Sequence, residues 1–415
     1  MIETEQLIKN KDFKQVTECR CCGSDRLTKY LDLGFLPLSN NLAASTIASF
    51  NKEKFPLQVL FCEECALSQL SIVVDPSVMF GHYVYRSSIS KTYQNHCRQM
   101  AKELKPRLTK DSFMIDIGSN DGTLLREFKE EIGLKIMGID PAENLAAICD
   151  AAGIPNMTYF WGLGTARKIV NTFGKADLIT ATNVFAHCDN VKEFIIAAKH
   201  ALKDNGILVL EFPYLIDFIE NNEFDTIYFE HLSYFSIAPL ARLCYECDMN
   251  VMSVSKQEIH GGTVRVTIGT GVIDKSVFDF MEQEKEYATS AKYMDWSTKV
   301  NHTVNELKYH LSKLKYEGKK IAAFAASAKG NTLLNCANIT VGTINYIVDQ
   351  TPEKIGQYSP GTGIPIVSMD DLIRTPPDYL VILSWNFANE IKLKCRLAGY
   401  KGKFIIPIPE FKIIE

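Results

Sequence analysis

Apolar runs alternate with helix-patterned segments over the middle of the chain. The runs typical of buried strands are FMIDIG (113–118), KIMGID (135–140), ADLITATNVF (176–185) and ILVLEFP (207–213). Between them lie amphipathic segments, one ending on Gly153 and another, VKEFIIAAKHALKDNG, ending on Gly206. Strands and helices that alternate at these lengths predict a parallel sheet with helices on both faces.

A second α/β pattern occupies the last part of the chain. Its predicted strands are KIAAFAA (320–326), INYIVD (344–349), YLVILSW (379–385) and KFIIPIP (403–409). Residues 274–318, between the two patterns, are charged and helix-like, so we place a boundary near residue 318. Residues 1–15 indicate a frayed or helical leader.

Composition narrows the class of protein. The chain has 415 residues, 46% of them hydrophobic and 23% charged, with a formal net charge of -4, as expected of a globular protein of several domains. A general nucleic-acid binder would need an excess of Lys and Arg. No stretch approaches the about 20 apolar residues that span a bilayer, and the N-terminus lacks the apolar core of a secretory signal. We therefore predict a cytoplasmic protein with no membrane or nucleic-acid partner, and favour a monomer.

Two cysteine pairs, Cys19-x-x-Cys22 and Cys62-x-x-Cys65, stand about forty residues apart. Four thiolates so paired can hold a tetrahedral zinc ion, and the long spacing implies an inserted hairpin. Such a closed site is structural and leaves no position for catalysis, so we assign it none. Unligated thiols are the alternative, and Cys21 is an ambiguous neighbour. The pair Cys244 and Cys247, without a partner pair, is more typical of core packing.

A glycine loop, DIGSNDG, follows the first predicted strand and opens a helix. It differs from the dinucleotide fingerprint because position 120 is Asn, and it resembles motif I of class I methyltransferases. Asp140 ends the next strand, where a carboxylate can accept hydrogen bonds from ribose hydroxyls. We predict an S-adenosylmethionine site; the alternative is a tight turn without a ligand. The candidate residues are Asp116, Gly118, Asn120, Gly122, Asp140, Phe160, Trp161 and Asn183.

A polar aromatic cluster, Tyr228-Phe229-Glu230-His231, follows the strand ILVLEFP. A carboxylate beside an imidazole is a common general-base arrangement near neutral pH. His187, after the third strand, and His260, in a glycine turn, are expected on the same sheet edge. Each histidine alone would favour a structural role, but their convergence favours chemistry.

Together with further motifs, these features make the chain resemble the sugar-nucleotide C-methyltransferases over about residues 18–412. The resemblance rests on CRCCG…LDLGFLPLSNNL…CEECALSQL, YVYRSSIS, DIGSNDGTLL, YFEHLSYFS, HGGTVRV, AASAKGNTLLN, IVDQTPEKIGQYSPGTGIPI and SWNFANEI. It implies an α/β protein with a class I methyltransferase Rossmann-like fold, an N-terminal zinc-binding module and a C-terminal Rossmann-like domain. The implied ranges are 1–75 for the zinc module, 76–272 for the methyltransferase domain, 273–318 for a helical connector and 319–415 for the nucleotide-sugar domain.

The family resemblance also implies roles for matching residues. His231 would be the base, assisted by Glu230 and Tyr228, with His187 nearby and Tyr83 and Tyr85 reaching over the site. The C-terminal domain would bind the nucleotide diphosphate. The substrate candidates are His260, Lys329, Asn331, Asp349, Lys354, Ser359, Trp385 and Asn386. Ser119, where a cysteine is frequent, is a mild departure.

These residues predict C-methylation of a nucleoside-diphosphate 4-keto-6-deoxysugar. The keto group at carbon 4 acidifies the proton on carbon 3, a base removes it, and the enolate accepts the methyl of S-adenosylmethionine. Two alternatives remain: an RNA or protein methyltransferase with a zinc ribbon, and a non-catalytic nucleotide-sugar-binding protein.

Overall fold

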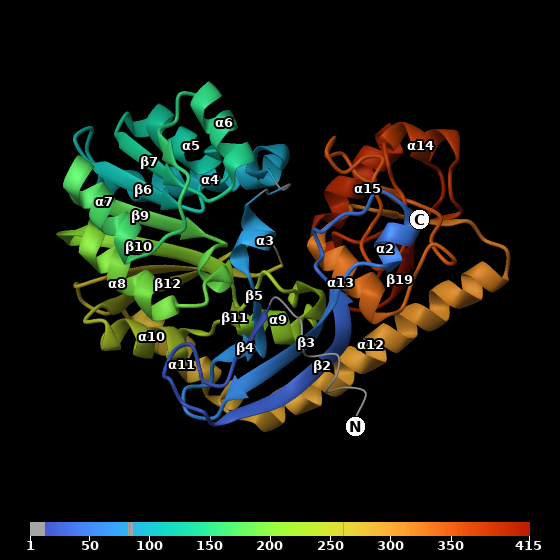
Figure 1. Cartoon of the computed structure of the whole chain (residues 1–415), viewed down its shortest axis with the longest axis horizontal. Helices are drawn as coiled ribbons and strands as arrows, with labels where there is room; N and C mark the ends of the chain where they lie inside the picture. Colours follow the sequence, from blue (N-terminus) through green and yellow to red (C-terminus); the bar gives the residue numbers. More distant parts are fainter. Residues whose placement is uncertain (1–12, 82, 84–85, 260) are drawn as a thin grey trace.

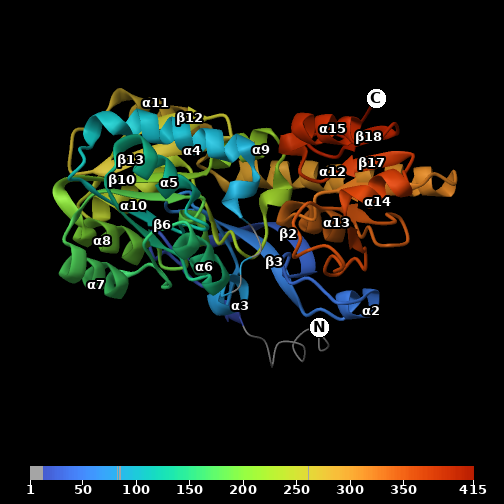
Figure 2. The same ribbon diagram turned by 90° about the horizontal axis from the view of Figure 1, so that it is seen from above.

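The computed structural model describes residues 13–81, 83, 86–259 and 261–415. A central α/β body and a C-terminal α/β body stand on either side of a β-hairpin that belongs to the N-terminal module (Figure 1). The long helix α12 (Ser290–Tyr316) passes along both bodies, and the view from above shows the same side-by-side arrangement (Figure 2). Within the described residues, no helix is long and apolar enough to cross a membrane.

The central body is built on a seven-stranded sheet of order β12-β13-β10-β9-β6-β7-β8. Its strands are β6 (Phe113–Ile117), β7 (Lys135–Ile139), β8 (Asn156–Met157), β9 (Ala176–Thr182), β10 (Leu202–Pro213), β12 (Asn250–Gln257) and β13 (Thr263–Gly269). The pairs β8-β7, β7-β6, β6-β9 and β9-β10 are parallel, whereas β13 runs antiparallel to both of its neighbours. The sheet is thus parallel, as predicted, except for one reversed strand.

Helices cover both faces of this sheet because alternate strand residues point to opposite sides. Leu178 packs with Phe128 and Met100 on one face, whereas Ile179 shares the other face with Ile169. The helices of this body are α3 (Pro76–Phe80), α4 (Lys91–Leu104), α5 (Thr123–Ile132), α6 (Glu143–Ala151), α7 (Leu163–Phe173), α8 (Val191–Ala201), α9 (Leu215–Glu220) and α10 (Ile237–Glu246), followed by α11 (Lys275–Gln283).

The helix expected to end on Gly206 is shorter than predicted. Helix α8 ends at Ala201, and Leu202 already pairs with Ala176 of β9, ahead of a bulge. Lys203 adds an ion pair with Asp177, at 2.8 Å. Pairing with the neighbouring strand therefore takes these residues away from the helix.

The N-terminal module contains a four-stranded sheet of order β11-β4-β3-β2. The strands β2 (Leu27–Pro37) and β3 (Lys54–Cys62) form the hairpin expected between the cysteine pairs, and β4 (Ser68–Leu70) follows. The edge strand β11 (Ser233–Tyr234) comes from the central body. The catalytic candidates at 228–231 are therefore joined directly to the N-terminal module.

The predicted leader is wrong over its last residues. Phe13–Gln15 form strand β1, which pairs antiparallel with β5 (Ile72–Val74). Residues 1–12 lie outside the described residues. The module's short helix α2 (Thr46–Phe50) reaches the C-terminal body, where the buried Ser49 hydroxyl donates to the Ser359 carbonyl at 2.7 Å.

The C-terminal body has a six-stranded sheet of order β16-β15-β14-β17-β18-β19, parallel except for β19. Its strands are β14 (Ile321–Phe324), β15 (Ile347–Val348), β16 (Ile366–Val367), β17 (Tyr379–Ile382), β18 (Lys403–Ile406) and β19 (Lys412–Ile414). Its helices are α13 (Ala328–Cys336), α14 (Met369–Arg374) and α15 (Ala388–Leu397). This is the second α/β unit that the sequence predicted.

Candidate active site

A cavity of about 730 Å³ opens between the central and C-terminal bodies. Ligands of open α/β sheets bind at the carboxyl ends of the strands, and this is where the cavity lies. Most of the predicted site residues line it: Tyr83, Asp116, Gly118, Asn120, Asp140, Phe160, Trp161, Asn183, His187, Tyr228, Glu230, His231, Lys329, Lys354 and Asn386. Gly122 does not line it; this glycine precedes α5 at φ 76°, where a Cβ would lie 2.5 Å from Ile154.

The glycine loop contains residues with left-handed backbone conformation. Gly118 has φ of 67°, and a Cβ there would lie 2.0 Å from Val184 Cγ2, so only glycine fits. Asn120 has φ of 52°, and its backbone N–H donates to Asp140 Oδ2 at 2.9 Å. The Asp140 Oδ1 atom accepts from the Ala142 N–H at 2.9 Å. The carboxylate is thereby fixed at the end of β7, facing the cavity.

Burial changes the pKa values of the acidic groups in this crevice. It raises the pKa of Asp140, and it raises the pKa of Asp116 to about 7, although the Thr180 hydroxyl donates to the Asp116 carboxylate at 2.6 Å. Trp161 donates its indole N–H to the Phe194 carbonyl at 3.2 Å, whereas Phe160 is half exposed. Asp116 is thus bonded to Thr180 of β9 beside the loop, while Phe160 and Trp161 border the crevice.

Ser87 and Ser88, which precede α4, contact the glycine loop. The backbone N–H of Ser87 donates to Asn120 Oδ1, and that of Ser88 donates to Asp121 Oδ2, both at 3.0 Å. Tyr83 is held against α6 because Asn144 bonds both its N–H, at 3.0 Å, and its carbonyl, at 2.9 Å. The sequence motif YVYRSSIS marked this segment, but the contacts with Asp121 could not be predicted from it.

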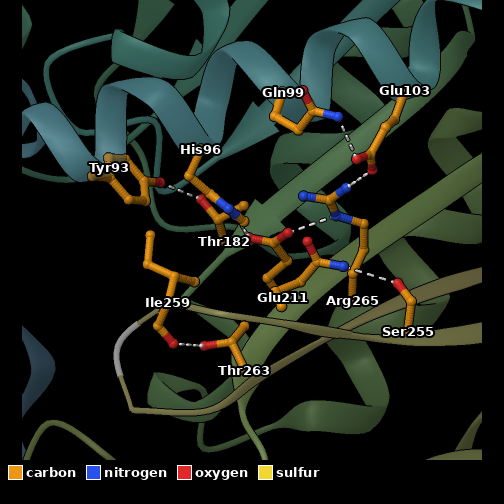
Figure 3. A network of polar contacts seen from close by, with 11 residues as sticks. Tyr93, His96, Gln99, Glu103, Thr182, Glu211, Ser255, Ile259, Thr263 and Arg265 are labelled. Atoms are coloured by element: carbon orange, nitrogen blue, oxygen red, sulfur yellow. Dashed lines mark hydrogen bonds and ion pairs between the residues drawn. The ribbon is translucent and has the colours of Figure 1, made fainter. Parts of the chain in front are cut away.

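A buried polar network joins α4 to β9, β10 and β13 across one face of the sheet (Figure 3). Glu211, at the end of β10, contacts His96 Nε2 at 2.7 Å and Arg265 Nε at 2.6 Å. The Tyr93 hydroxyl lies 2.9 Å from the Thr182 hydroxyl, and both residues line the cavity. Since Ser87 and Ser88 directly precede α4, fixing α4 also places these two residues against the glycine loop.

His231 has one assigned tautomer, because a carbonyl can only accept. Its Nδ1 lies 2.8 Å from the Thr226 carbonyl and must carry the proton; its Nε2 therefore accepts from the Tyr228 hydroxyl at 2.8 Å. Burial, with nearby His187, holds the pKa of His231 well below its usual value. The imidazole is neutral, and its basic nitrogen is directed at Tyr228.

His187 lies beside this pair. Its ring centroid is 5.0 Å from that of His231, and it stacks on Phe80 at 5.5 Å. Burial lowers the pKa of His187 to about 4. Its buried Nε2 atom has no hydrogen-bond partner among the described residues. A neutral imidazole with this buried, unpaired Nε2 is suited to a polar group of a ligand in the cavity.

Glu230 joins three parts of the chain. Its carboxylate accepts from the amide of Asn40, in the N-terminal module, at 2.5 Å and from the hydroxyl of Tyr83 at 3.1 Å. Burial raises the pKa of Glu230 to about 7. Sequence reasoning missed Asn40, which lines the cavity from the segment after β2. Nothing in its local pattern distinguishes it from a loop asparagine.

The C-terminal body contributes two cations to the cavity. The Lys354 ammonium is largely buried, donates to the Ala326 carbonyl at 2.7 Å and lies 4.0 Å from Asp349. Lys329 lies 3.6 Å from Glu223, whose pKa burial raises to about 7. Among the described residues, neither ammonium has more than one close polar partner, so both have donors left for an anionic ligand.

Other substrate candidates lie away from the cavity lining. Asn331 donates to Ser359 Oγ at 2.9 Å, and Asp349 accepts from the Ala326 N–H at 2.7 Å. Trp385 lies under Lys329, at 5.5 Å, and donates to Asp225 at 2.8 Å. These residues shape the loops that present the lysines. Tyr85 and His260 lie outside the described residues.

The four predicted zinc ligands converge at one end of the N-terminal module. The Sγ atoms of Cys19, Cys22, Cys62 and Cys65 all lie within 4.8 Å of one another. The closest pairs are Cys19–Cys65 at 3.5 Å and Cys22–Cys62 at 3.6 Å. A tetrahedral ion with Zn–S bonds of about 2.3 Å requires sulfur separations near these values. The cluster therefore fits a four-thiolate zinc.

Three family models match successive parts of the chain. They are described as "Putative zinc binding domain" for residues 19–80, "Methyltransferase domain" for 90–254 and "C-methyltransferase C-terminal domain" for 258–409. The C-methyltransferase NovU of Streptomyces niveus is 31% identical over 411 residues, covering 97% of this chain and 98% of NovU.

Similar solved structures are methyltransferases that align with part of the chain. The plantazolicin methyltransferase BpumL, in complex with SAH, is 12% identical with a TM-score of 0.35, covering 44% of this chain and 90% of BpumL. Magnesium protoporphyrin IX methyltransferase from Synechocystis, with bound SAH, is 12% identical with a TM-score of 0.34, covering 42% of this chain and 82% of that enzyme.

The central sheet and its glycine-loop crevice define a class I methyltransferase. The match with NovU over nearly the whole chain goes further: the chain belongs to the C-methyltransferase family. The predicted α/β fold class is confirmed, as is an S-adenosylmethionine-dependent methyltransferase with a zinc-binding module.

Proposed function

We propose that this C-methyltransferase methylates carbon 3 of a nucleoside-diphosphate 4-keto-6-deoxysugar. The observation that carries the proposal is the shared cavity, where the glycine-loop crevice, the His187–His231 cluster and the C-terminal lysines meet. A nucleotide sugar needs an anion site joined to a site for acid–base chemistry. Here Lys354 and Lys329 supply the first, and the buried histidines and Glu230 supply the second.

The crevice residues suit the methyl donor. The Asp140 carboxylate would accept hydrogen bonds from ribose hydroxyls, and Gly118 leaves room for a close approach to the loop backbone. Phe160 and Trp161 would border the adenine. When bound, S-adenosylmethionine supplies a methyl group on a sulfonium centre, which a carbanion-like carbon accepts without further activation. Every other catalytic demand rests on the chain's own groups.

Proton removal is assigned to the Tyr228–His231 pair. Nε2 of His231 accepts a hydrogen bond from the Tyr228 hydroxyl. The hydroxyl proton can therefore pass to Nε2 while the tyrosyl oxygen takes the proton from carbon 3. The imidazolium that forms keeps its Nδ1–H bond to the Thr226 carbonyl. His231 is thus the base, acting through Tyr228 or directly if the substrate displaces the hydroxyl.

The enolate oxygen requires a donor, and His187 is placed to provide one. Its unused Nε2 would donate to the oxygen on carbon 4, and its low pKa keeps the ring neutral. Glu230 holds Tyr83 over the cavity through the 3.1 Å hydrogen bond. Closing the site in this way excludes water that would quench the enolate.

A thermal-shift panel tests the substrate class. The full chain, saturated with S-adenosylhomocysteine, is heated with dTDP, GDP, CDP, UDP or an RNA oligomer. A ligand at about 100 times its Kd stabilises a protein by about 2.7 kcal/mol, so the matching diphosphate should raise Tm clearly. A shift with RNA, and none with any diphosphate, would instead favour the nucleic-acid alternative.

A further inference from the structure

The arginine between the first zinc-ligand cysteines reaches into the catalytic region. The Arg20 side chain is 3% exposed, and its Nε donates to Asp189 Oδ1 at 3.1 Å. Its Nη1 donates to the carbonyls of Leu70 and Leu232, each at 3.1 Å. Leu232 directly follows His231, and Asp189 lies in the turn just after His187. One guanidinium therefore touches both histidine-bearing segments.

Backbone hydrogen bonds near Arg20 also link the zinc-binding module to the two histidine-bearing segments. The Arg20 N–H donates to the Gln69 side chain at 2.9 Å, and Gln69 pairs with Ser233 across the β4–β11 ladder. The Leu232 N–H donates to the Ala186 carbonyl at 2.8 Å, which ties the two histidine segments to each other. Because a zinc ion held by Cys19 and Cys22 would fix the backbone on both sides of Arg20, it would also fix where the Arg20 side chain begins.

Stability alone is a weak reason for this arrangement. Removing a guanidinium from water is costly, and a buried ion pair often contributes less than well-packed apolar side chains would. The partner Asp189 is itself shared with the exposed Lys14, at 3.5 Å. The guanidinium does provide hydrogen bonds of fixed direction. Its planar group holds two carbonyls and one carboxylate in set positions relative to one another.

We propose that Arg20 is a positioning residue for catalysis, through which the zinc site sets the relative placement of His187 and His231. The zinc ion then has a role beyond the folding of its module. The kinetic part of this inference rests on the proposed function, whereas the placement of the histidines does not.

Three variants of the full-length protein separate positioning from folding. Arg20→Met removes every donor while keeping an apolar stem, and Arg20→Lys restores a single cation. Arg26→Met is the matched control, because Arg26 belongs to the same module but its side chain is exposed and, among the described residues, contacts only Glu64. Zinc content and Tm are measured for each.

The histidine rings are then observed directly by NMR of protein labelled with ¹⁵N-histidine. Wild type and Arg26→Met should show His231 as the Nδ1–H tautomer with a slowly exchanging proton. Arg20→Met, with its zinc retained, should shift the His231 and His187 signals and speed the exchange of that proton. An unchanged spectrum in zinc-loaded Arg20→Met overturns the proposal.

The kinetic readout uses dTDP-4-keto-6-deoxyglucose as the probe, in deuterated water. Exchange of its carbon 3 proton should fall about 10- to 100-fold in Arg20→Met, with unchanged affinity for S-adenosylhomocysteine and partial recovery in Arg20→Lys. Wild-type exchange rates in Arg20→Met contradict the proposal. Absence of exchange in wild type counts against the proposed substrate, and the histidine spectra still decide the role of Arg20.

If Arg20→Met loses its zinc, Asp189→Asn replaces it, since Asp189 lies outside the module. Lys14→Ala is its control, because it removes the other partner of Asp189. Altered His231 signals in Asp189→Asn but not in Lys14→Ala support the proposal, because Asp189 reaches that segment through Arg20, whereas His187 is its near neighbour in the sequence. His231 signals identical to those of wild type in both variants overturn it.

Discussion

The hydroxyl of Tyr228 lies 2.8 Å from Nε2 of His231, and Nδ1 of the same ring donates to the Thr226 carbonyl. This chain of contacts gives the proposed base a defined tautomer before any substrate binds. It predicts that His231→Asn keeps both ligands bound but slows turnover by about 100-fold or more, and Tyr228→Phe slows it too. Exchange of the carbon 3 proton without the methyl donor is the measurement. Normal exchange with failed methylation would move the base to Glu230 or His187.

Asp140 should matter for the methyl donor more than for the nucleotide sugar. Asp140→Asn removes a charge that ribose hydroxyls would use, and hydrogen bonds to charged groups contribute about 1.5–3 kcal/mol. Calorimetry should therefore show affinity for S-adenosylhomocysteine falling about 10- to 100-fold, with affinity for the nucleoside diphosphate little changed. The exposed Asp150→Asn is the control on the neighbouring helix α6. Equal losses for both ligands would make Asp140 a structural residue.

Lys354 should have the opposite ligand dependence. Lys354 is buried, with 8% of the residue exposed, and it lines the cavity, so Lys354→Met should raise Kd for the matching diphosphate about 10-fold by removing a cation that would pair with a phosphate. Affinity for S-adenosylhomocysteine should stay unchanged. Lys319→Met, an exposed position in the same body, is expected to bind both ligands like wild type. Wild-type diphosphate binding by Lys354→Met would remove this lysine from the substrate site.

Glu230 should make stability depend on pH. Burial raises its folded-state pKa from an ordinary 4.5 to about 7, so between these values the folded protein holds more protons than the unfolded chain. Stability from this group is therefore lost as pH rises through that window, by up to about 3 kcal/mol. Glu230→Gln should raise Tm relative to wild type at pH 8 but not at pH 4.5. Glu258→Gln, at an exposed site, should show no such pH-dependent difference.

Features set by local spacing could be predicted from the sequence. The cysteine pairs, the glycine loop with Asp140, and the alternating strands each follow short-range rules. The missed features depend on segments far apart in the chain. Asn40 reaches Glu230, and Arg20 reaches Leu232, only because β11 joins the sheet of the N-terminal module. Strand β1 was missed for the same reason, since its short ladder exists only against β5.

Methyl transfer to carbon 3 can be observed in a single product spectrum. Wild-type protein is incubated with S-adenosylmethionine labelled with ¹³C in its methyl group and with dTDP-4-keto-6-deoxyglucose, or with the sugar of the diphosphate that the thermal-shift panel selects. Methyl transfer to carbon 3 predicts a labelled C–CH₃ group on that carbon, with a one-bond carbon–carbon coupling to the ring. A labelled methoxy group, or a methyl on another carbon, would contradict it.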